Sequence, residues 1–447
     1  MKSKKVWRES DTNYRPISTV LDSIIDRRGL TATKIGGKWE NHEGIPVISA
    51  NNIKNGLFVE LDSVKRINSE LFEKWMPIKL ERGDVLLVSE GATFGELLYL
   101  GESLKAALGQ RLFAIRCNND YDSRYLYYYL KSKKGQQELR ARTTGTSVLG
   151  IRQSELRQIV VPDIRIEEQK EIADILGSVD NKILLNRQMN NILEATAGAI
   201  FKRWFVDFEF PNEEGKPYKS SGGEMVYNED LSKDIPKGWT VTKLGEVVRF
   251  LRGVSYKSED LEESEKALVS LKSIARGGGF NAEGLKSYTG EYREEQVLKS
   301  GDIVVAHTDL TQKAEVLGKP ALIRRVRNFK TLIASMDLGI IRPNDGKSNS
   351  YVYLLLKSES FQNHIVGYAN GTTVLHLSNK GVKEYLFAVP PWELTSKFGK
   401  VVDDLFKKIE QNSLESETLI QLREVLLPKL MSGKIRVSVP NESTGAH

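Results

Sequence analysis

The sequence predicts an α+β protein in which two similar domains, each of mixed α/β type with a twisted sheet, are joined by two long helices that form an antiparallel coiled coil. Three observations predict it. The chain repeats itself once, each copy begins with short apolar segments bounded by glycine, and each copy ends with a long segment that contains no proline. A repeat whose period is about half of the chain indicates a duplicated domain, because solenoid repeats span about 20–50 residues.

The repeat extends through the whole chain and keeps its order. Four pairs of segments match: ISANNI from Ile48 with VSLKSI from Val269, GDVLLV from Gly83 with GDIVVA from Gly301, YLYYYLKS from Tyr125 with YVYLLLKS from Tyr351, and GTSVL from Gly145 with GTTVL from Gly371. The separation is the same for the last two pairs and slightly shorter for the first two, and loop insertions explain this drift. The apolar runs predict short strands, and the aromatic run predicts a short helix.

The repeat and the composition of the intervening segments predict the domain boundaries. We expect a basic N-terminal tail at 1–13, a first domain at 14–165, a first long helix at 166–207, a connector at 208–237, a second domain at 238–393, a second long helix at 394–433 and a C-terminal tail at 434–447. The connector is rich in proline, glycine, serine and charge, which predicts an exposed segment.

Apolar residues in both long helices recur every seven residues in two interleaved rows, which is typical of the inward positions of a coiled coil. Asn186 and Asn412 interrupt the rows at matching places, and such a polar layer fixes register at a cost in stability. Ser416 and Arg423 at inward positions make the second helix a weaker seam. The predicted seam residues are Ile172, Leu176, Val179, Ile183, Asn186, Leu193 and Ile200 in the first helix, and Val402, Leu405, Ile409, Asn412, Leu419 and Leu426 in the second.

The first long helix also carries apolar residues outside this seam. Apolar side chains on more than one helix face indicate that further helices pack there. We therefore expect a helical partner protein to contact Leu184, Leu185, Ile192, Phe201 and Phe205.

Composition limits the class of protein. The 447 residues include 65 basic and 59 acidic ones, and the net charge of +6 mildly favours a polyanionic partner. The single cysteine, Cys117, excludes an internal disulfide and is typical of a reducing compartment. No apolar run approaches the roughly 18 residues of a membrane span, and the basic start lacks the apolar segment of a secretory signal. We expect a cytoplasmic protein without a membrane partner.

Catalytic signatures are missing from the sequence. There is no GxxxxGK[ST] phosphate loop, and the five histidines do not have metal-ligand spacing. The segment AVPPW at 388–392 is similar to the Pro-Pro-aromatic motif of amino-methyltransferases, but Val389 replaces the polar residue that accepts a hydrogen bond from the target amine. We therefore expect no catalytic residue, no bound metal and no cofactor in this chain.

The two copies agree in their strands and differ in the polar loops between them. Side chains of these types form hydrogen bonds with base edges and phosphates, which predicts two surfaces that bind different DNA sequences. Arginine and lysine suit guanine or phosphate, asparagine and glutamine suit adenine, and Glu90 suits a cytosine amine. The candidate DNA-binding residues are Asn51, Asn52, Lys54, Ser89, Glu90, Thr93, Thr146, Ser147 and Arg152 in the first domain, and Lys272, Arg276, His307, Thr308, Gln312, Lys313, Thr372, Thr373, His376 and Lys380 in the second.

The chain resembles the specificity subunits of type I restriction–modification systems over essentially its whole length. The resemblance rests on the two GT[ST]VL loops, on the segments VVPDIRIEEQKEI and AVPPWELTSKF that each precede a long helix, and on the central segment at 203–239. It implies that two target recognition domains bind the halves of a bipartite, asymmetric double-stranded DNA target. It also implies that the helix pair sets the spacer between the half-sites.

The resemblance further implies the partners and their cofactors. Two methyltransferase subunits would dock around the helices and carry S-adenosylmethionine, and motor-nuclease subunits would use ATP and Mg²⁺. The specificity subunit itself would catalyse nothing. Three alternatives remain: a specificity subunit whose partner fuses methyltransferase and nuclease, a protein–protein scaffold, and a free-standing methyltransferase, which the AVPPW segment and the missing cofactor-binding βαβ unit oppose.

Overall fold

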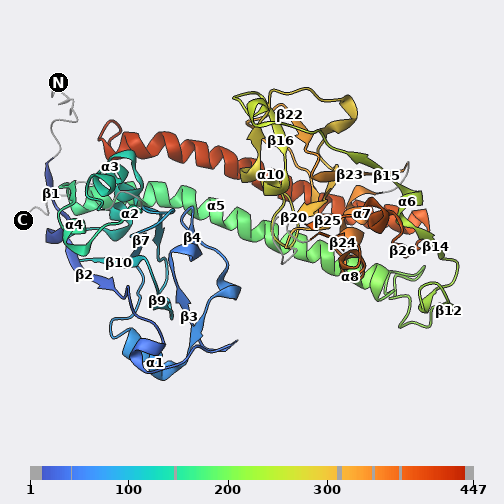
Figure 1. The fold of residues 1–447 in the computed structure, drawn as a ribbon, viewed down its shortest axis with the longest axis horizontal. Coiled ribbons are helices and arrows are strands. Elements are labelled where there is room, and N and C mark those ends of the chain that lie inside the picture. Colours follow the sequence, from blue (N-terminus) through green and yellow to red (C-terminus); the bar gives the residue numbers. More distant parts are fainter. Residues whose placement is uncertain are drawn as a thin grey trace, which may run out of the picture. The chain divides into compact units, whose positions relative to one another are not determined.

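The computed structural model describes residues 13–41, 43–144, 148–309, 315–344, 348–371 and 375–437, and these form two compact units (Figure 1). The first unit contains the chain up to Lys182 together with the chain from Leu419 on, and the second contains Ile183–Thr418. Both boundaries fall inside the two longest helices, α5 (Ile166–Phe201) and α10 (Trp392–Met431). Each long helix therefore belongs partly to one unit and partly to the other. A short π-helical stretch, Lys202–Val206, continues α5.

The first unit is built on an antiparallel sheet with the order β2 (Leu21–Asp26), β10 (Leu112–Cys117), β7 (Val85–Val88) and β8 (Leu97–Tyr99). All four residues of β7 are buried, because the sheet is covered on both faces. Val85 and Leu87 pack into the core that contains α2 (Ser123–Lys131), and Leu86 and Val88 pack into a second core on the other face. This alternation follows from the two-residue period of a strand.

A shorter layer of strands forms the second core. There β3 (Ile45–Ile48) runs parallel to β9 (Ala107–Leu108). The remaining elements of this unit are β1 (Tyr14–Pro16), β4 (Ile53–Lys54), β5 (Leu57–Phe58), β6 (Arg66–Ile67), β11 (Val160–Pro162), α1 (Ser69–Trp75), α3 (Lys133–Ala141) and α4 (Gln153–Leu156).

The second unit repeats this architecture with the sheet order β15 (Val248–Arg252), β23 (Leu338–Pro343), β19 (Ile303–Ala306) and β21 (Pro320–Leu322). The match extends to individual residue pairs. Phe113 lies opposite Asp26 and Leu87 in the first unit. Gly339, which the sequence repeat aligns with Phe113, lies opposite Arg252 and Val305 in the second. The predicted fold class, two similar α+β domains joined by long helices, is confirmed.

The smaller parallel layer also recurs, with β16 (Lys266–Val269) beside β22 (Thr331–Ala334). The aromatic helix recurs as α7 (Asn349–Lys357). The other elements are β12 (Met225–Asn228), β13 (Lys233–Pro236), β14 (Thr240–Lys243), β17 (Lys286–Ser287), β18 (Val297–Leu298), β20 (Thr308–Asp309), β24 (Ala369–Asn370), β25 (Leu375–Leu377), β26 (Leu386–Val389), α6 (Leu244–Val247), α8 (Glu359–Val366) and α9 (Asn379–Lys383).

The connector ends in a β-hairpin, β12–β13, whose tip is mostly exposed. The start of the connector is not exposed, because Phe208 and Phe210 are buried in the core of the second unit. The ring of Phe210 stacks between those of Tyr218 and Trp239, with centroids 4.5 Å and 5.5 Å away. Aromatic residues therefore anchor the connector to the second unit. Its polar composition predicted an exposed segment and did not indicate this anchor.

Within the second unit, the paired stretches of α5 and α10 run antiparallel around the predicted polar layer. The Asn186 amide donates to the Asn412 carbonyl oxygen at 3.3 Å and to the Glu415 carboxylate at 2.9 Å. The Asn412 amide donates in turn to the Asn190 side chain at 2.9 Å. Both asparagines are buried, so these bonds satisfy groups that water cannot reach.

The predicted seam residues are all buried or half-buried along the two helices. Arg423, at an inward position that weakened the predicted seam, forms an ion pair with Asp180 at 2.6 Å in the first unit. The Tyr128 hydroxyl of α2 donates to the same carboxylate at 2.8 Å. The polar interruption is therefore an interaction that links both long helices to the aromatic helix of the unit.

Candidate DNA interface

In the first unit, several loops meet where β7 ends and β10 begins. The Ile151 amide donates to the Ser89 carbonyl at 2.9 Å, and the Gly91 amide donates to the Leu149 carbonyl at 3.0 Å. The Ser89 amide donates to the carbonyl of Arg111, which lies in the turn before β10. The predicted polar loops at 89–96 and 150–155 are thus next to each other, although they are far apart in sequence.

The loop at 49–56 joins the same surface. The Ala50 amide donates to the Gln110 carbonyl at 3.3 Å, and the Asn55 amide donates to the Glu96 carboxylate at 3.1 Å. This loop begins with the short 3₁₀ turn Ala50–Asn52, which presents Asn51 to solvent. We call these loops, 49–56, 89–96, 109–111 and 148–152, the first loop surface.

Arg28 holds the first loop surface together. Its guanidinium donates to both carboxylate oxygens of Asp26, at 3.0 Å and 2.8 Å. A further nitrogen reaches the Ile151 carbonyl at 3.3 Å and the Ser89 hydroxyl at 3.4 Å. The guanidinium carbon lies 3.9 Å from the centre of the Phe113 ring, which is a cation–π distance. No local sequence signal indicates this role, since the loop partners of Arg28 lie 61 and 123 residues away.

Most predicted residues of the first domain reach the first loop surface. Asn51, Lys54, Thr93 and Arg152 are exposed, and Glu90 is half-buried. Thr146 and Ser147 lie outside the described residues.

Two predictions in this set are corrected. Ser89 is completely buried, and Asn52 is 7% exposed. The Asn52 side chain accepts from the Ser49 amide at 3.0 Å and donates to the Val59 carbonyl at 3.2 Å. Both residues therefore hold the loop in place and offer no surface for base contacts.

The second unit has an equivalent second loop surface, formed by the described residues of 270–284, 307–309, 335–337 and 375–378. Strands β20 and β25 pair the half-buried Thr308 with the exposed His376. The Thr308 hydroxyl donates to the Asp337 carboxylate at 3.2 Å. Lys272 is exposed, and Arg276 is exposed with its guanidinium 3.2 Å from the Glu315 carboxylate.

The remaining predictions for the second domain divide in three ways. Lys380 is exposed on α9 and lies 3.7 Å from Glu384 of the same helix. Gln312, Lys313, Thr372 and Thr373 lie outside the described residues. The prediction for His307 is corrected, because this side chain is buried and only 6% exposed.

Burial lowers the pKa of His307 from 6.5 to about 4, and the charge of Arg252 adds to the effect. The neutral ring is therefore favoured in the fold, and its Nε2 has no hydrogen-bond partner among the described residues. Because the folded pKa lies below the unfolded pKa, the contribution to stability is present above about pH 6.5. It is lost as the pH falls from there toward 4.

We expect the free energy of unfolding of the second unit to fall by about 2 kcal/mol from pH 7 to pH 5 because of His307. Hydrogen exchange of β19 and β23 amides at both pH values measures it. The variant His307→Leu cannot be protonated and should lose this part of the pH dependence. The same pH dependence in wild type and variant would show that another group titrates.

The residues predicted to contact a partner protein separate into two groups. Leu184, Leu185 and Ile192 are exposed, with 41%, 49% and 66% of their surface accessible. Phe201 and Phe205 are buried, and the prediction for these two is wrong. Their rings pack against Phe398 and Tyr351, so residues of the same unit cover the helix face that heptad counting left open.

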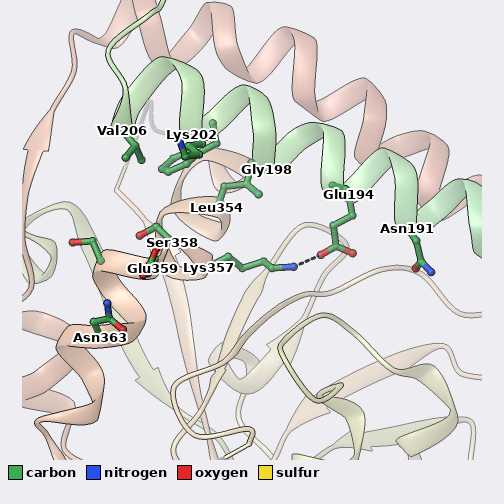
Figure 2. A pocket seen from close by; sticks show the side chains of 13 residues that line it. Asn191, Glu194, Gly198, Lys202, Val206, Leu354, Lys357, Ser358, Glu359 and Asn363 are labelled. Atoms are coloured by element: carbon green, nitrogen blue, oxygen red, sulfur yellow. Dashed lines mark hydrogen bonds and ion pairs between the residues drawn. The ribbon is translucent and has the colours of Figure 1, made fainter. Parts of the chain in front are cut away.

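A groove of about 750 Å³ lies between the C-terminal part of α5 and the helices α7 and α8 (Figure 2). Figure 2 shows the Lys357 side chain directed at Glu194, with which it pairs at 2.8 Å. The Tyr353 hydroxyl donates to the same carboxylate at 2.6 Å. The charge of Lys357 and these hydrogen bonds outweigh burial and hold the pKa of Glu194 below its usual range.

Two kinds of feature are absent from the residues that the structure describes. No group of three or more histidine, cysteine, aspartate or glutamate side chains among them is arranged to hold a metal ion. Within the same part of the chain, no helix combines the length and the apolar character needed to cross a membrane.

Two units with one scaffold and different exposed loops define a duplicated recognition protein. The comparisons identify its family. The chain matches the family model described as the type I restriction modification DNA specificity domain twice, over residues 14–195 and 236–420. The chain belongs to this family.

Known relatives and a solved structure are similar over most of their length. The type I restriction enzyme MjaIX specificity subunit of Methanocaldococcus jannaschii is 28% identical over 91% of this chain and 90% of the relative. The MjaVIII specificity subunit of the same organism is 26% identical over 88% of this chain and 86% of the relative. The crystal structure of the type I S subunit from M. genitalium shares the fold, with a TM-score of 0.55, 19% identity, and coverage of 96% and 97%.

Proposed function

We propose that this chain is the DNA specificity subunit of a type I restriction–modification enzyme and that each unit reads one half of a bipartite, asymmetric target. The observation that carries the proposal is the duplication of the loop surface. The two sheets have the same register, while Glu90 in one unit is replaced by Thr308 in the other and Asn51 by Lys272. One scaffold that displays different donors and acceptors suits two different base sequences.

In this proposal the chain recognises DNA and does not catalyse. S-adenosylmethionine would be bound by two methyltransferase subunits, and ATP and Mg²⁺ would be used by motor-nuclease subunits. The exposed residues Leu184, Leu185 and Ile192 on α5 support a helical docking surface for the methyltransferase subunits. The chain crosses from one unit to the other within the two long helices, and these helices would set the spacer between the half-sites.

Methylation-sensitive sequencing tests this function. The chain is expressed with its methyltransferase subunits in cells that lack other methylation. We expect methylated adenines or cytosines within one bipartite motif and co-purification of the methyltransferase subunits with this chain. Methylation without any sequence motif, or no methylation by an assembled complex, would contradict the proposal.

A salt titration of DNA binding by the same complex distinguishes a DNA reader from a protein scaffold. Phosphate contacts release counterions, so the logarithm of the binding constant should fall steeply and linearly with the logarithm of salt concentration. A protein scaffold would show no specific DNA binding at any salt concentration.

A further inference from the structure

The common register identifies one position that the two units use with opposite charge. Arg111 immediately precedes β10, and Asp337, which the repeat aligns with Arg111, immediately precedes β23. Both strands are central in their sheets, each lying between two neighbours. Each residue also lies beside the loop that follows a neighbouring strand: Arg111 near Glu90 after β7, and Asp337 near Thr308 after β19. The sequence predictions included Glu90 and Thr308 but neither Arg111 nor Asp337.

Arg111 is fixed at its backbone and accessible at its side chain. Its φ of 64° lies in the left-handed region, which few residues other than glycine adopt. Its carbonyl accepts from the Ser89 amide at 2.9 Å, and the next residues of the chain, 112–115, are buried in β10. The side chain is 54% exposed. A long cationic side chain is thus presented from a rigid strand end, and precise placement of this kind is what base recognition requires.

The surroundings of Arg111 favour a base edge over a phosphate. The Glu90 carboxylate lies 3.9 Å from Arg111 Nε, and this negative charge would repel a phosphate that approached the guanidinium. The edge of a base is uncharged and is not repelled in this way. Guanine offers two adjacent acceptors, O6 and N7, that match two guanidinium donors.

Asp337 offers the opposite chemistry at the equivalent position. Its side chain is half-buried, its backbone carbonyl accepts from the His307 amide at 2.8 Å, and its carboxylate accepts from the Thr308 hydroxyl at 3.2 Å. An ionised carboxylate only accepts hydrogen bonds and repels phosphate, so its partner on DNA is an amino group. The amino group at N4 of cytosine is the usual partner of an aspartate in the major groove.

We propose that Arg111 and Asp337 are specificity-determining residues at equivalent positions, Arg111 selecting a guanine in one half-site and Asp337 a cytosine in the other. Arg28 acts as a positioning residue in the first unit, because it joins β2 to Ser89, the residue whose amide donates to the Arg111 carbonyl. Val254 stands at the matching place of the second copy, so the second unit lacks this arginine. The inference rests on the proposed function and adds to it the identity of one base in each half-site.

Methylation-sensitive sequencing of the variants Arg111→Ala and Asp337→Ala, expressed with the methyltransferase subunits, tests the assignment. Each variant should lose discrimination at a single position of a single half-site, guanine for Arg111→Ala and cytosine for Asp337→Ala. Loss of one good contact corresponds to about a 5- to 150-fold change in base preference. The other half-site serves as the internal standard in both variants.

Two matched controls make the same changes of charge away from the loop surfaces, before the first residue of a strand whose other end leads into a loop surface. Arg82→Ala removes an exposed arginine before β7, and Glu265→Ala removes an exposed acid before β16. Neither should change the motif. Arg111→Lys keeps the charge but not the bidentate fork, so it should retain DNA binding and relax the guanine position. This variant also covers the case in which Arg111→Ala fails to fold.

The outcomes separate this inference from the proposed function. If the wild-type complex methylates no motif, the proposed function fails. If it methylates a motif that Arg111→Ala, Arg111→Lys and Asp337→Ala leave unchanged, only the present assignment fails. A uniform loss of binding across all DNA sequences would show that Arg111 contacts phosphate, and it would overturn the assignment to guanine.

Discussion

Replacing Phe398 with alanine lowers the free energy of unfolding of the second unit by about 3–5 kcal/mol. The side chain is completely buried, and its ring meets those of Trp204 and Phe205 with centroids 5.7 Å and 4.9 Å away. It also meets Tyr351 of α7 at 6.4 Å. Both long helices and the aromatic helix therefore lose packing at once, and the rigid surroundings cannot close the cavity.

Denaturant unfolding followed by the fluorescence of the tryptophans measures this loss. Trp392→Ala is the matched control, since it removes a larger aromatic side chain from the same helix at a position that is 65% exposed. A surface change of this kind costs no more than about 0.5 kcal/mol. Equal losses in the two variants would show that the aromatic cluster does not hold the unit together.

Inserting seven residues into α5 after Lys182 and another seven into α10 after Thr418 lengthens the DNA spacer by about three base pairs. The insertion adds about 10.5 Å to each helix, and base pairs lie about 3.4 Å apart. Seven residues preserve the inward positions on both helices, because the seam has a seven-residue period. The half-sites themselves should not change, because neither loop surface is altered.

Sequencing of methylated sites measures the spacer directly. Seven residues inserted at the tip of the β12–β13 hairpin, within Glu229–Ser232, provide the control and should leave the spacer unchanged. Insertion into α5 alone should lower the unfolding temperature, because α5 can then no longer keep both Asp180 beside Arg423 and Asn186 beside Asn412. An unchanged spacer after the paired insertion, with both half-sites still methylated, would reject the role of the helices in spacing.

Much of the fold was predictable, because its signals are local or periodic. The strands at 85–88 and 303–306 stand out as apolar runs after a Gly-Asp turn, and a seven-residue count found the layer of Asn186 and Asn412. The same count misplaced Phe201 and Phe205. It describes a pair of helices, whereas these residues also pack against α7 and the connector.

The reading surface was predictable as a set of loops but not residue by residue. Ser89 and His307 follow buried strands, and the sequence does not show that the adjoining loops cover them. Arg28 and Arg111 were missed for the opposite reason. Their significance depends on loops that come together only in the fold, such as those at Ser89 and Ile151.

The division of the chain has a consequence for its synthesis on the ribosome. The first unit draws its core from the beginning of the chain and from its end, because Leu430 is buried among residues such as Ile172 and Leu176. All of Ile183–Thr418 must leave the exit tunnel before that residue is available. The domain that is translated first is therefore completed last, and a premature stop codon just before Leu430 damages the amino-terminal fold rather than its neighbour.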